Sequence, residues 1–272
     1  MAASQEESGQ QPCWQAELEQ LIAEPEEPLA IRSFIGSPMR TASRPAHAMG
    51  MDGKVYIVKG QQAGRQIVND QIVGCLGVLL GAPVGNPCIV EVDKILTNDP
   101  DEPEFAYFQP GLAHATQLIR DTVDDREMRR YQGQAVNRDR FARLSVLYGW
   151  VGAADRQFLY KSQLPNAVSS VDHGHFFPHG PNWTIKDLLA APQAVLDPEI
   201  VNVCQLQSSE IGEALIALVN LSATEILRAV ARPPGEWGIT IKERVALVDY
   251  LVKRRQELLK TALGSISQEG TE

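Results

Sequence analysis

The sequence predicts an α+β fold with a strand-rich N-terminal part and a mostly helical C-terminal part. Short strand-like runs bounded by glycine and proline gather in the first part, at residues 54–59, 88–92 and 105–108. Beyond residue 138, apolar residues recur mainly at helical spacing, and the run at 241–263 carries the longest amphipathic stripe. We therefore expect two packed parts, with the cleft between them as a natural ligand site.

Composition and charge disfavour several classes of protein. The 272 residues carry a net charge of −9, which disfavours binding to nucleic acid or to an anionic membrane. The chain starts without a charged-then-apolar targeting signal and has no run of about 18 apolar residues, so we expect a cytoplasmic protein without a membrane span. No Cys-x-x-Cys pair occurs, which predicts neither a zinc site nor a disulfide framework for Cys13, Cys75, Cys88 and Cys204.

The N-terminal part begins with a polar tail and a possible short helix at residues 14–21. Residues 35–50 have the glycine, proline and serine content that is typical of a loop. A turn at 51–53 then leads into the strand at 54–59, and this order indicates a hairpin.

Lys59 ends that strand. Because side chains alternate along a strand, Val55, Ile57 and Lys59 share one face. A lysine on an apolar face needs an anionic partner there. A helix is predicted at about residues 67–80, and the glycines and prolines of 81–87 end it.

Two acidic residues mark the helical part. An apolar segment leads into a polar turn at Asp155, and a strand-like run at 167–171 ends at Asp172.

Ser222 and Glu225 have the spacing of a capping box, which predicts a helix start. Five helices are predicted after the strand, at 185–189, 198–206, 209–221, 224–230 and 241–263. We expect four segments in all: a tail with a short helix at 1–28, the strand-rich part at 29–118, the helical part at 119–263 and a flexible tail at 264–272.

The order of charged residues fits phosphoryl transfer, a reaction that needs mainly positioning and charge compensation. Lys59 would neutralise nucleotide phosphates, and Asp70 on the following helix would hold that lysine. The loop at 41–44, with Ser43 and Arg44, would cover the phosphates from the side of the hairpin.

The two acidic residues complete this set, 17 positions apart (172 − 155). Asp155 would orient the acceptor hydroxyl, and Arg156 would steady the loop or the transferred group. Asp172, two residues before Gly174, would hold Mg²⁺ under the phosphates.

Six short motifs carry a resemblance to a known family: Thr41-Ala-Ser-Arg-Pro45, Val55-Tyr-Ile-Val-Lys59-Gly, Val68-Asn-Asp70, Leu80-Gly-Ala-Pro-Val84, Ala154-Asp155-Arg156-Gln157 and Val171-Asp172-His-Gly-His-Phe-Phe177. With them the chain resembles the HipA-like kinases over roughly residues 35–190. The resemblance implies a two-lobed fold like that of protein kinases and phosphatidylinositol kinases, with a small β-rich lobe that has one main helix and a larger, mostly helical lobe. It implies ATP and Mg²⁺ as cofactors, Lys59 as the ATP lysine, Asp155 as the catalytic-loop aspartate and Asp172 as the metal aspartate.

Two positions depart from the pattern of the family it resembles. The catalytic loop usually has an asparagine five residues after its aspartate, as a second metal ligand, and here that position is Tyr160. A phenol, with a pKa near 10, is a poor ligand for Mg²⁺. Either Gln157, Asn166 or water supplies the missing ligand, or the metal site is weakened. The helix position usually occupied by glutamate is Asp70, which is one methylene shorter.

Three functions therefore follow as predictions. The first is an ATP-dependent phosphotransferase acting on a hydroxyl acceptor. The sequence leaves open protein serine or threonine, a small alcohol, a lipid headgroup and a nucleic-acid-linked target, the last disfavoured by the negative net charge. The second, favoured by Tyr160, is a pseudokinase that binds nucleotide as a sensing or scaffolding module. The third is a metal-dependent hydrolase around Asp172, His173, His175 and His179, because His-x-His can bind transition metals. The competing expectation for His173 and His175 is hydrogen bonding around the Asp172 loop.

Overall fold

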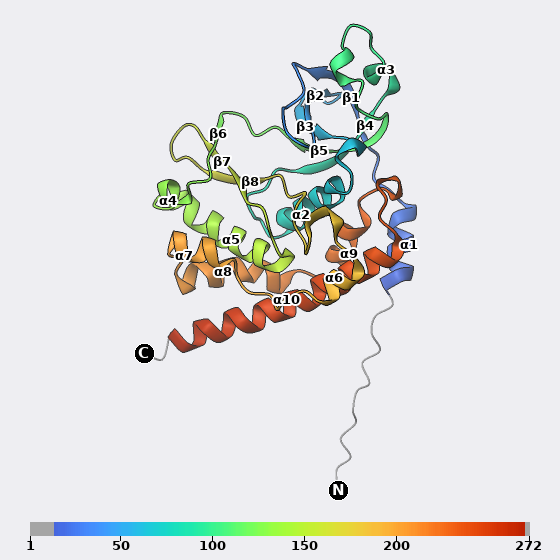
Figure 1. Cartoon of the computed structure of the whole chain (residues 1–272). Coiled ribbons are helices and arrows are strands. Elements are labelled where there is room, and N and C mark those ends of the chain that lie inside the picture. The colour runs from blue at the N-terminus through green and yellow to red at the C-terminus, as the bar shows by residue number, and fades with distance from the viewer. Residues whose placement is uncertain (1–13, 270–272) are drawn as a thin grey trace.

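Five strands close into a barrel in the strand-rich N-terminal part of the structure, a computed structural model that describes residues 14–269 (Figure 1). The strand order is β1-β2-β3-β5-β4, and β1 and β4 close the barrel by pairing in parallel. The strands are β1 (Leu29–Ile35), β2 (Ala46–Gly50), β3 (Val55–Lys59), β4 (Pro87–Val92) and β5 (Gly111–Gln117). The predicted turn at 51–53 joins β2 to β3, so the expected hairpin is confirmed.

Aromatic side chains fill the barrel. The Phe34 ring stacks on Phe105 with 4.3 Å between centroids and lies 4.9 Å from Phe108. The strand predicted at 105–108 is therefore wrong: Phe105 ends the short helix η2 (Pro103–Phe105), and Phe105 and Phe108 are buried inside the barrel. The predicted loop at 35–50 is also partly wrong, because its last five residues form β2.

Helix α2 (Gln66–Leu79) lies between the barrel and the helical part (Figure 1). It follows a short helix, η1 (Gln61–Ala63), and its residues from Ile67 to Gly77 are all buried. A helix that is covered on all sides needs apolar residues around its whole circumference. The few polar residues that α2 does bury, which include Asn69 and Asp70, must therefore have partners.

A second, three-stranded sheet lies between the barrel and the helices, in the order β6-β7-β8 (Figure 1). It consists of β6 (Thr122–Asp124), β7 (Gln157–Lys161) and β8 (Val168–Val171), all antiparallel. The strand predicted at 167–171 is confirmed as β8. Val84, from the loop after α2, bridges to Ser170 in parallel and so ties this sheet to the helix.

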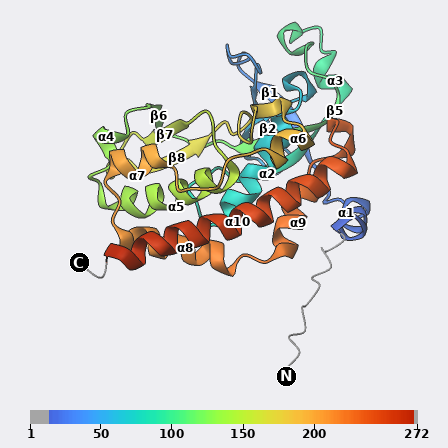
Figure 2. The same ribbon diagram turned by 60° about the horizontal axis from the view of Figure 1, so that its bottom comes forward.

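Helices form the rest of the core, and α10 runs along the base of the molecule beside α8 and α9 (Figure 2). Ser222 and Glu225 form the predicted capping box of α9. The final helix begins at the predicted residue 241 but continues to Glu269, six residues beyond its expected end. Residues 1–13, with Cys13 and the expected polar tail, and residues 270–272 lie outside the described part. The helices are α1 (Trp14–Ala23), α3 (Lys94–Thr97), α4 (Met128–Tyr131), α5 (Ala135–Val151), α6 (Ile185–Leu189), α7 (Pro198–Cys204), α8 (Ser208–Asn220), α9 (Ala223–Ala231) and α10 (Ile241–Glu269), with short helices η3 (Gly180–Asn182) and η4 (Gly235–Trp237).

Within residues 14–269 no single helix is both long and apolar enough to cross a membrane; α8 and α9, bent by 78° at their junction, reach that length and composition only as a pair. The three described cysteines, Cys75, Cys88 and Cys204, are free thiols.

Two helical glycines give a matched test of the packing between α5 and the segment before α7. A Cβ on Gly149 would lie 2.1 Å from the carbonyl oxygen of Val195, whereas a Cβ on Gly212 of α8 would meet nothing within 4 Å. We expect Gly149→Ala to lower the free energy of unfolding by more than about 2 kcal/mol, and Gly212→Ala to raise it by up to about 1 kcal/mol through helix propensity. Urea unfolding of both variants checks this, and equal effects of the two substitutions would contradict the packing described.

Candidate active site

Lys59, the last residue of β3, lies buried between two carboxylates. Its Nζ is 2.9 Å from Oδ2 of Asp70 on α2 and 2.6 Å from Oδ1 of Asp172, which directly follows β8. Lys59 and Asp70 are 7% and 4% exposed, whereas the Asp172 side chain is 31% exposed, so the cluster is closed on one side and accessible on the other. Three residues predicted from the sequence therefore meet here from three separate elements.

The charges of this cluster stabilise one another. Burial disfavours the ammonium form of Lys59, but the carboxylates of Asp70 and Asp172 outweigh burial and raise the pKa of the lysine. Burial also disfavours the ionised form of Asp70, but the charge of Lys59 outweighs it and lowers the pKa of that carboxyl. One ammonium between two carboxylates leaves the cluster with one net negative charge.

Gln157 connects Asp172 to the second predicted acidic residue. Gln157 is the first residue of β7 and pairs with Val171, so the register of the hairpin places it beside Asp172. Its Nε2 donates to Oδ2 of Asp172 at 3.3 Å and, at 3.5 Å, to Oδ2 of Asp155. Asp70, Lys59, Asp172, Gln157 and Asp155 consequently form one chain of polar contacts.

Asp155 lies in the turn between α5 and β7, and α10 fixes where that turn begins. Gly152, which ends α5, has a φ of 76°, in the left-handed region that favours glycine. Arg254 of α10 donates to the carbonyl oxygens of Gly149 and Trp150 at 2.6 and 2.7 Å. These contacts satisfy carbonyl groups that a helix end leaves free, and they hold the turn in place.

Arg156 forms its ion pairs outside the Lys59 cluster. Its guanidinium pairs with Asp197 and, at 2.9 Å, with Glu199. Asp197 is itself buried and caps α7 by accepting from the backbone N–H of Ile200 at 2.9 Å. Arg156 therefore ties the Asp155 turn to the start of α7 and does not line the cavity next to Lys59.

The loop at 41–44 contributes only partly to the cavity wall. Thr41 and Pro45 line the cavity, whereas Ser43 and Arg44 do not. Ser43 is buried, and its carbonyl oxygen accepts from the side chain of Gln62. The Arg44 guanidinium lies 3.7 Å from the centre of the Tyr107 ring. These two predicted residues are thus occupied with packing contacts on the barrel.

Tyr160 faces the protein core instead of the cavity. Along β7, Gln157 and Leu159 line the cavity, and strand alternation sends Tyr160 to the opposite side. There its ring stacks on Tyr131 with 3.7 Å between centroids, and its hydroxyl has no hydrogen-bond partner among the described residues. Gln157, and not Tyr160, therefore lies beside Asp172, because β7 starts only two residues after Asp155.

Two buried histidines that the charge pattern alone did not mark flank the cluster. His173 lies 2.8 Å from the hydroxyl of Ser170, which confirms the expected hydrogen bonding for this histidine, whereas His175 is exposed. His114 pairs with Lys59 across β3 and β5 and lies 2.8 Å from the side-chain oxygen of Gln71. Burial disfavours the charged imidazolium and lowers the pKa of both histidines to about 4. Both rings are therefore neutral at neutral pH and add no positive charge to the site.

A cavity of about 350 Å³ lies between the barrel and the three-stranded sheet, with Lys59 and Asp172 in its wall. Its lining changes from apolar to charged and polar side chains along the strands. Ile57 precedes Lys59 by one strand repeat on the same face, and Leu159 follows Gln157 in the same way. The cavity therefore has an apolar section toward the connection after β5 and an ionic section at Lys59.

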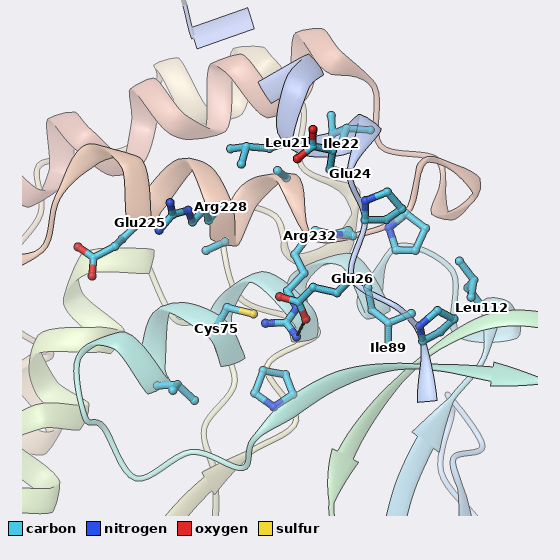
Figure 3. Close-up of a pocket in the computed structure, with 18 of the residues that line it drawn as sticks. Leu21, Ile22, Glu24, Glu26, Cys75, Ile89, Leu112, Glu225, Arg228 and Arg232 are labelled. Atoms are coloured by element: carbon cyan, nitrogen blue, oxygen red, sulfur yellow. Dashed lines mark hydrogen bonds and ion pairs between the residues drawn. The ribbon is translucent and has the colours of Figure 1, made fainter. Parts of the chain in front are cut away.

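A larger cavity, of about 860 Å³, lies against another face of α2 (Figure 3). Cys75 lines it from α2, and Leu21 and Ile22 line it from α1. Glu26 and Arg232 form an ion pair across it. None of the residues predicted for phosphoryl transfer is in its wall.

The donor set beside Lys59 suits magnesium better than a transition metal. Among residues 14–269 there is no group of three or more His, Cys, Asp or Glu side chains placed to hold a metal, so the centre that the hydrolase prediction requires is not present there. Asp172, Asp155 and Gln157 offer carboxylate and amide oxygens, which are the hard ligands that Mg²⁺ takes. Mg²⁺ is usually held by one or two carboxylates together with substrate phosphates, and these residues fit that arrangement.

The buried histidines predict a specific dependence of stability on pH. Their pKa values, about 4 in the folded protein, lie below the ordinary value of 6.5, so the unfolded chain binds more protons between these limits. Stability should therefore be complete above pH 6.5 and should fall as the pH decreases toward 4, by on the order of 2 kcal/mol for each histidine at pH 5.

Chemical unfolding at pH 7.5 and pH 5 measures this loss. The double variant His114→Gln, His173→Gln should show a smaller loss than the unsubstituted protein. Replacing the exposed His175 by glutamine serves as the matched control and should leave the loss unchanged. A double variant with an unaltered pH dependence would show that these two rings are not the buried neutral groups described.

Comparisons with known proteins agree with this geometry. Residues 31–177, more than half of the chain, match the family described as HipA-like kinase. No curated protein sequence matches the chain. Among solved structures, the Helicobacter pylori proinflammatory kinase CtkA is similar with a TM-score of 0.60 and 11% identity, over 87% of this chain and 96% of that one. At this identity the likeness shows the fold alone.

Two other solved structures are more distant. The Golgi casein kinase with Mn/ADP bound has a TM-score of 0.48 and 12% identity, over 90% of this chain and 75% of that one. HipA of Shewanella oneidensis MR-1, in a complex with HipB and operator DNA, has a TM-score of 0.42 and 12% identity, over 96% of this chain and 74% of that one. The fold argument therefore depends on CtkA, and the family assignment depends on the sequence match. By that match, this chain belongs to the HipA-like kinase family.

Proposed function

We propose that the protein is an ATP-dependent phosphotransferase that binds its nucleotide between the β-barrel and the helical part, as the two lobes of a kinase do. The observation that carries this proposal is the buried Lys59 between Asp70 and Asp172, at one side of a cavity. A lysine held by two carboxylates is fixed in position and remains charged, which is what the compensation of a phosphate requires.

The graded lining of the cavity supports a nucleotide as the ligand. Its apolar section, with Ile57, Leu118, Leu159 and Val171, offers flat contact to an aromatic base. Its ionic section then lies where the phosphates of the same molecule would reach Lys59. An apolar ligand would leave the ionic section unused, and a small anion would leave the apolar section unused.

The charge of the cluster supports a divalent cation beside the phosphates. Lys59 with Asp70 and Asp172 is net negative, and Asp155 adds a further negative charge. The neutral histidines do not offset this charge. Asp172, with the amide of Gln157 beside it, would hold Mg²⁺, which as a Lewis acid neutralises charge that develops on the transferred group.

Asp155 is proposed to act on the acceptor. Its side chain is 41% exposed, and Arg126 is the one cation among the described residues that approaches it, at 4.0 Å. An exposed carboxylate at the edge of the site can accept a hydrogen bond from an acceptor hydroxyl and orient it for in-line attack. Arg156 supports this role by fixing the turn through Asp197. The acceptor is assigned only as a hydroxyl compound, with protein serine or threonine as one class.

The two departures from the family pattern do not favour the pseudokinase. Tyr160 lies in the core, and Gln157 takes the place beside Asp172. Asp70, although shorter than glutamate, still reaches Lys59 at 2.9 Å. Nucleotide binding without turnover is therefore kept as an outcome of the experiment and not as a second proposal.

Nucleotide binding and turnover test these roles together. Calorimetric titration with MgADP should show binding to the unsubstituted protein, weakened at least about tenfold in Lys59→Ala and in Asp172→Asn, because each change removes a charge that contacts the phosphates or the metal. Phosphate release or autophosphorylation from ATP should fall by roughly 100-fold in both variants.

Tyr160→Phe is the matched control for these substitutions. It removes a buried hydroxyl without a partner among the described residues, so stability should be unchanged or higher by up to about 1 kcal/mol, and turnover should be retained. Loss of turnover in Tyr160→Phe would restore the phenol as a site residue. Full activity in Lys59→Ala or Asp172→Asn would refute the proposed roles, and MgADP binding with no turnover in any assay would identify a pseudokinase.

A further inference from the structure

We infer that Asn69, the neighbour of Asp70 on α2, is a positioning residue that holds the Asp172 loop in register with Lys59. The inference rests on the proposed function, because the proposed function makes Asp172 in this loop the aspartate that binds the metal. Asn69 is fully buried and would touch neither the nucleotide nor the metal. Its role is to set the position of Asp172 relative to the nucleotide and the metal.

The side chain of Asn69 spans the interior between α2 and the loop. Its Nδ2 donates to the carbonyl oxygens of Gly174 and Phe176, both at 2.9 Å. Its Oδ1 accepts from the indole N–H of Trp183 at 3.0 Å. Both donors and the acceptor oxygen of the amide are thus used, and every partner belongs to the segment that follows Asp172.

The orientation of this amide is determined by its partners. An indole N–H can only donate, and a carbonyl oxygen can only accept. Turning the Asn69 amide by 180° would place its NH₂ against the Trp183 N–H and its oxygen against two carbonyl oxygens. The geometry therefore requires asparagine at this position, because aspartate would lose both donors and leucine would lose all three bonds.

The loop needs such support because its backbone is unfavourable by itself. Asp172, Phe177 and His179 have φ values of 58°, 69° and 65°, in the left-handed region that residues other than glycine adopt at a cost of about 1 kcal/mol or more each. Such a conformation persists only where surrounding contacts determine it. The two bonds from Asn69 lie between these residues in sequence, at Gly174 and Phe176.

Close packing adds a second constraint at the same place. A Cβ on Gly174 would lie 2.9 Å from Cβ of Gln66 and 3.2 Å from Oδ2 of Asp70, so the loop backbone already touches the first turn of α2. Successive residues of a helix point about 100° apart. Asn69 therefore holds the loop while Asp70 holds Lys59, and one turn of α2 sets the distance between the lysine and Asp172.

A positioning role predicts a loss that falls on the metal and not on the nucleotide. If the loop shifts, Asp172 moves relative to Lys59, and the affinity for a divalent cation in the nucleotide complex falls. Contacts of the base with the apolar section of the cavity do not involve the loop beyond Asp172 and His173. Outer contacts of metal ligands commonly change metal affinity by 10-fold to 100-fold.

The chain contains a matched control in Asn137 of α5. Asn137 is also fully buried; its Nδ2 donates to the carbonyl oxygens of Tyr131 and Asn166 at 3.0 and 3.1 Å, and its Oδ1 accepts from the backbone N–H of Val168 at 2.8 Å. Both asparagines thus make two donated bonds and one accepted bond. Only Asn69 makes them to the segment after Asp172.

The experiment compares Asn69→Asp with Asn137→Asp in the full chain. Mn²⁺ affinity is measured by electron paramagnetic resonance with saturating ADP, and ADP affinity is measured by calorimetry without metal. Asn69→Asp should weaken Mn²⁺ binding about tenfold and leave metal-free ADP binding within about twofold. An ionised carboxylate would by itself attract a cation, so weaker Mn²⁺ binding would point to changed geometry. Asn137→Asp should lower the unfolding temperature similarly and leave Mn²⁺ affinity within about twofold.

Unchanged Mn²⁺ affinity in Asn69→Asp, or equal losses in both variants, would overturn the positioning role. Should Asn69→Asp fail to fold, Trp183→Phe removes the donor to Oδ1 and leaves the amide less constrained, and it should weaken Mn²⁺ binding about threefold in the same assay. Absence of that change would equally contradict the inference. An unsubstituted protein that binds neither ADP nor Mn–ADP would instead refute the proposed function itself.

Discussion

The arrangement of this protein depends on one buried cation. Lys59 is almost removed from solvent, and an ammonium ion in that position costs several kcal/mol unless carboxylates surround it. Asp70 and Asp172 supply them, and each comes from a different element. The requirement to pair this charge therefore joins the barrel, α2 and the second sheet at one point. Removing either carboxylate would leave a buried charge only partly compensated.

The same requirement connects stability to ligand binding. Lys59 neutralises only one of its two partners, so the site keeps a negative charge that a divalent cation bound with the nucleotide can compensate. Phosphates of a bound nucleotide would compete with Asp172, the partly exposed partner, for Lys59, while the buried Asp70 keeps the lysine in place. Asp70 thus acts as the permanent partner of Lys59 and Asp172 as the exchangeable one. The register of β7 then explains why Tyr160 does not disturb this arrangement.

Charged residues were the most predictable part of the site, and backbone conformation was the least. Asp70 was expected to hold Lys59 because a buried charge needs a partner. Asp172 was expected at the same site as the metal aspartate, from the order of charged residues, and its direct contact with Lys59 was not predicted. The burial of Tyr160 was not predictable, because it depends on a strand starting only two residues after Asp155, which no turn signal marks. The apolar run at 105–108 was predicted as a strand, because a strand and a segment that packs into the barrel have the same apolar composition. Only the closed barrel distinguishes the two.

A crystal structure with Mn²⁺ and a nonhydrolysable ATP analogue tests the central claim most directly. The account predicts phosphate oxygens within hydrogen-bond distance of Nζ of Lys59, the metal on a carboxylate oxygen of Asp172 and the base in the apolar section near Ile57 and Leu159. An analogue seated in the cavity between Glu26 and Arg232, or with phosphates directed away from Lys59, would contradict it.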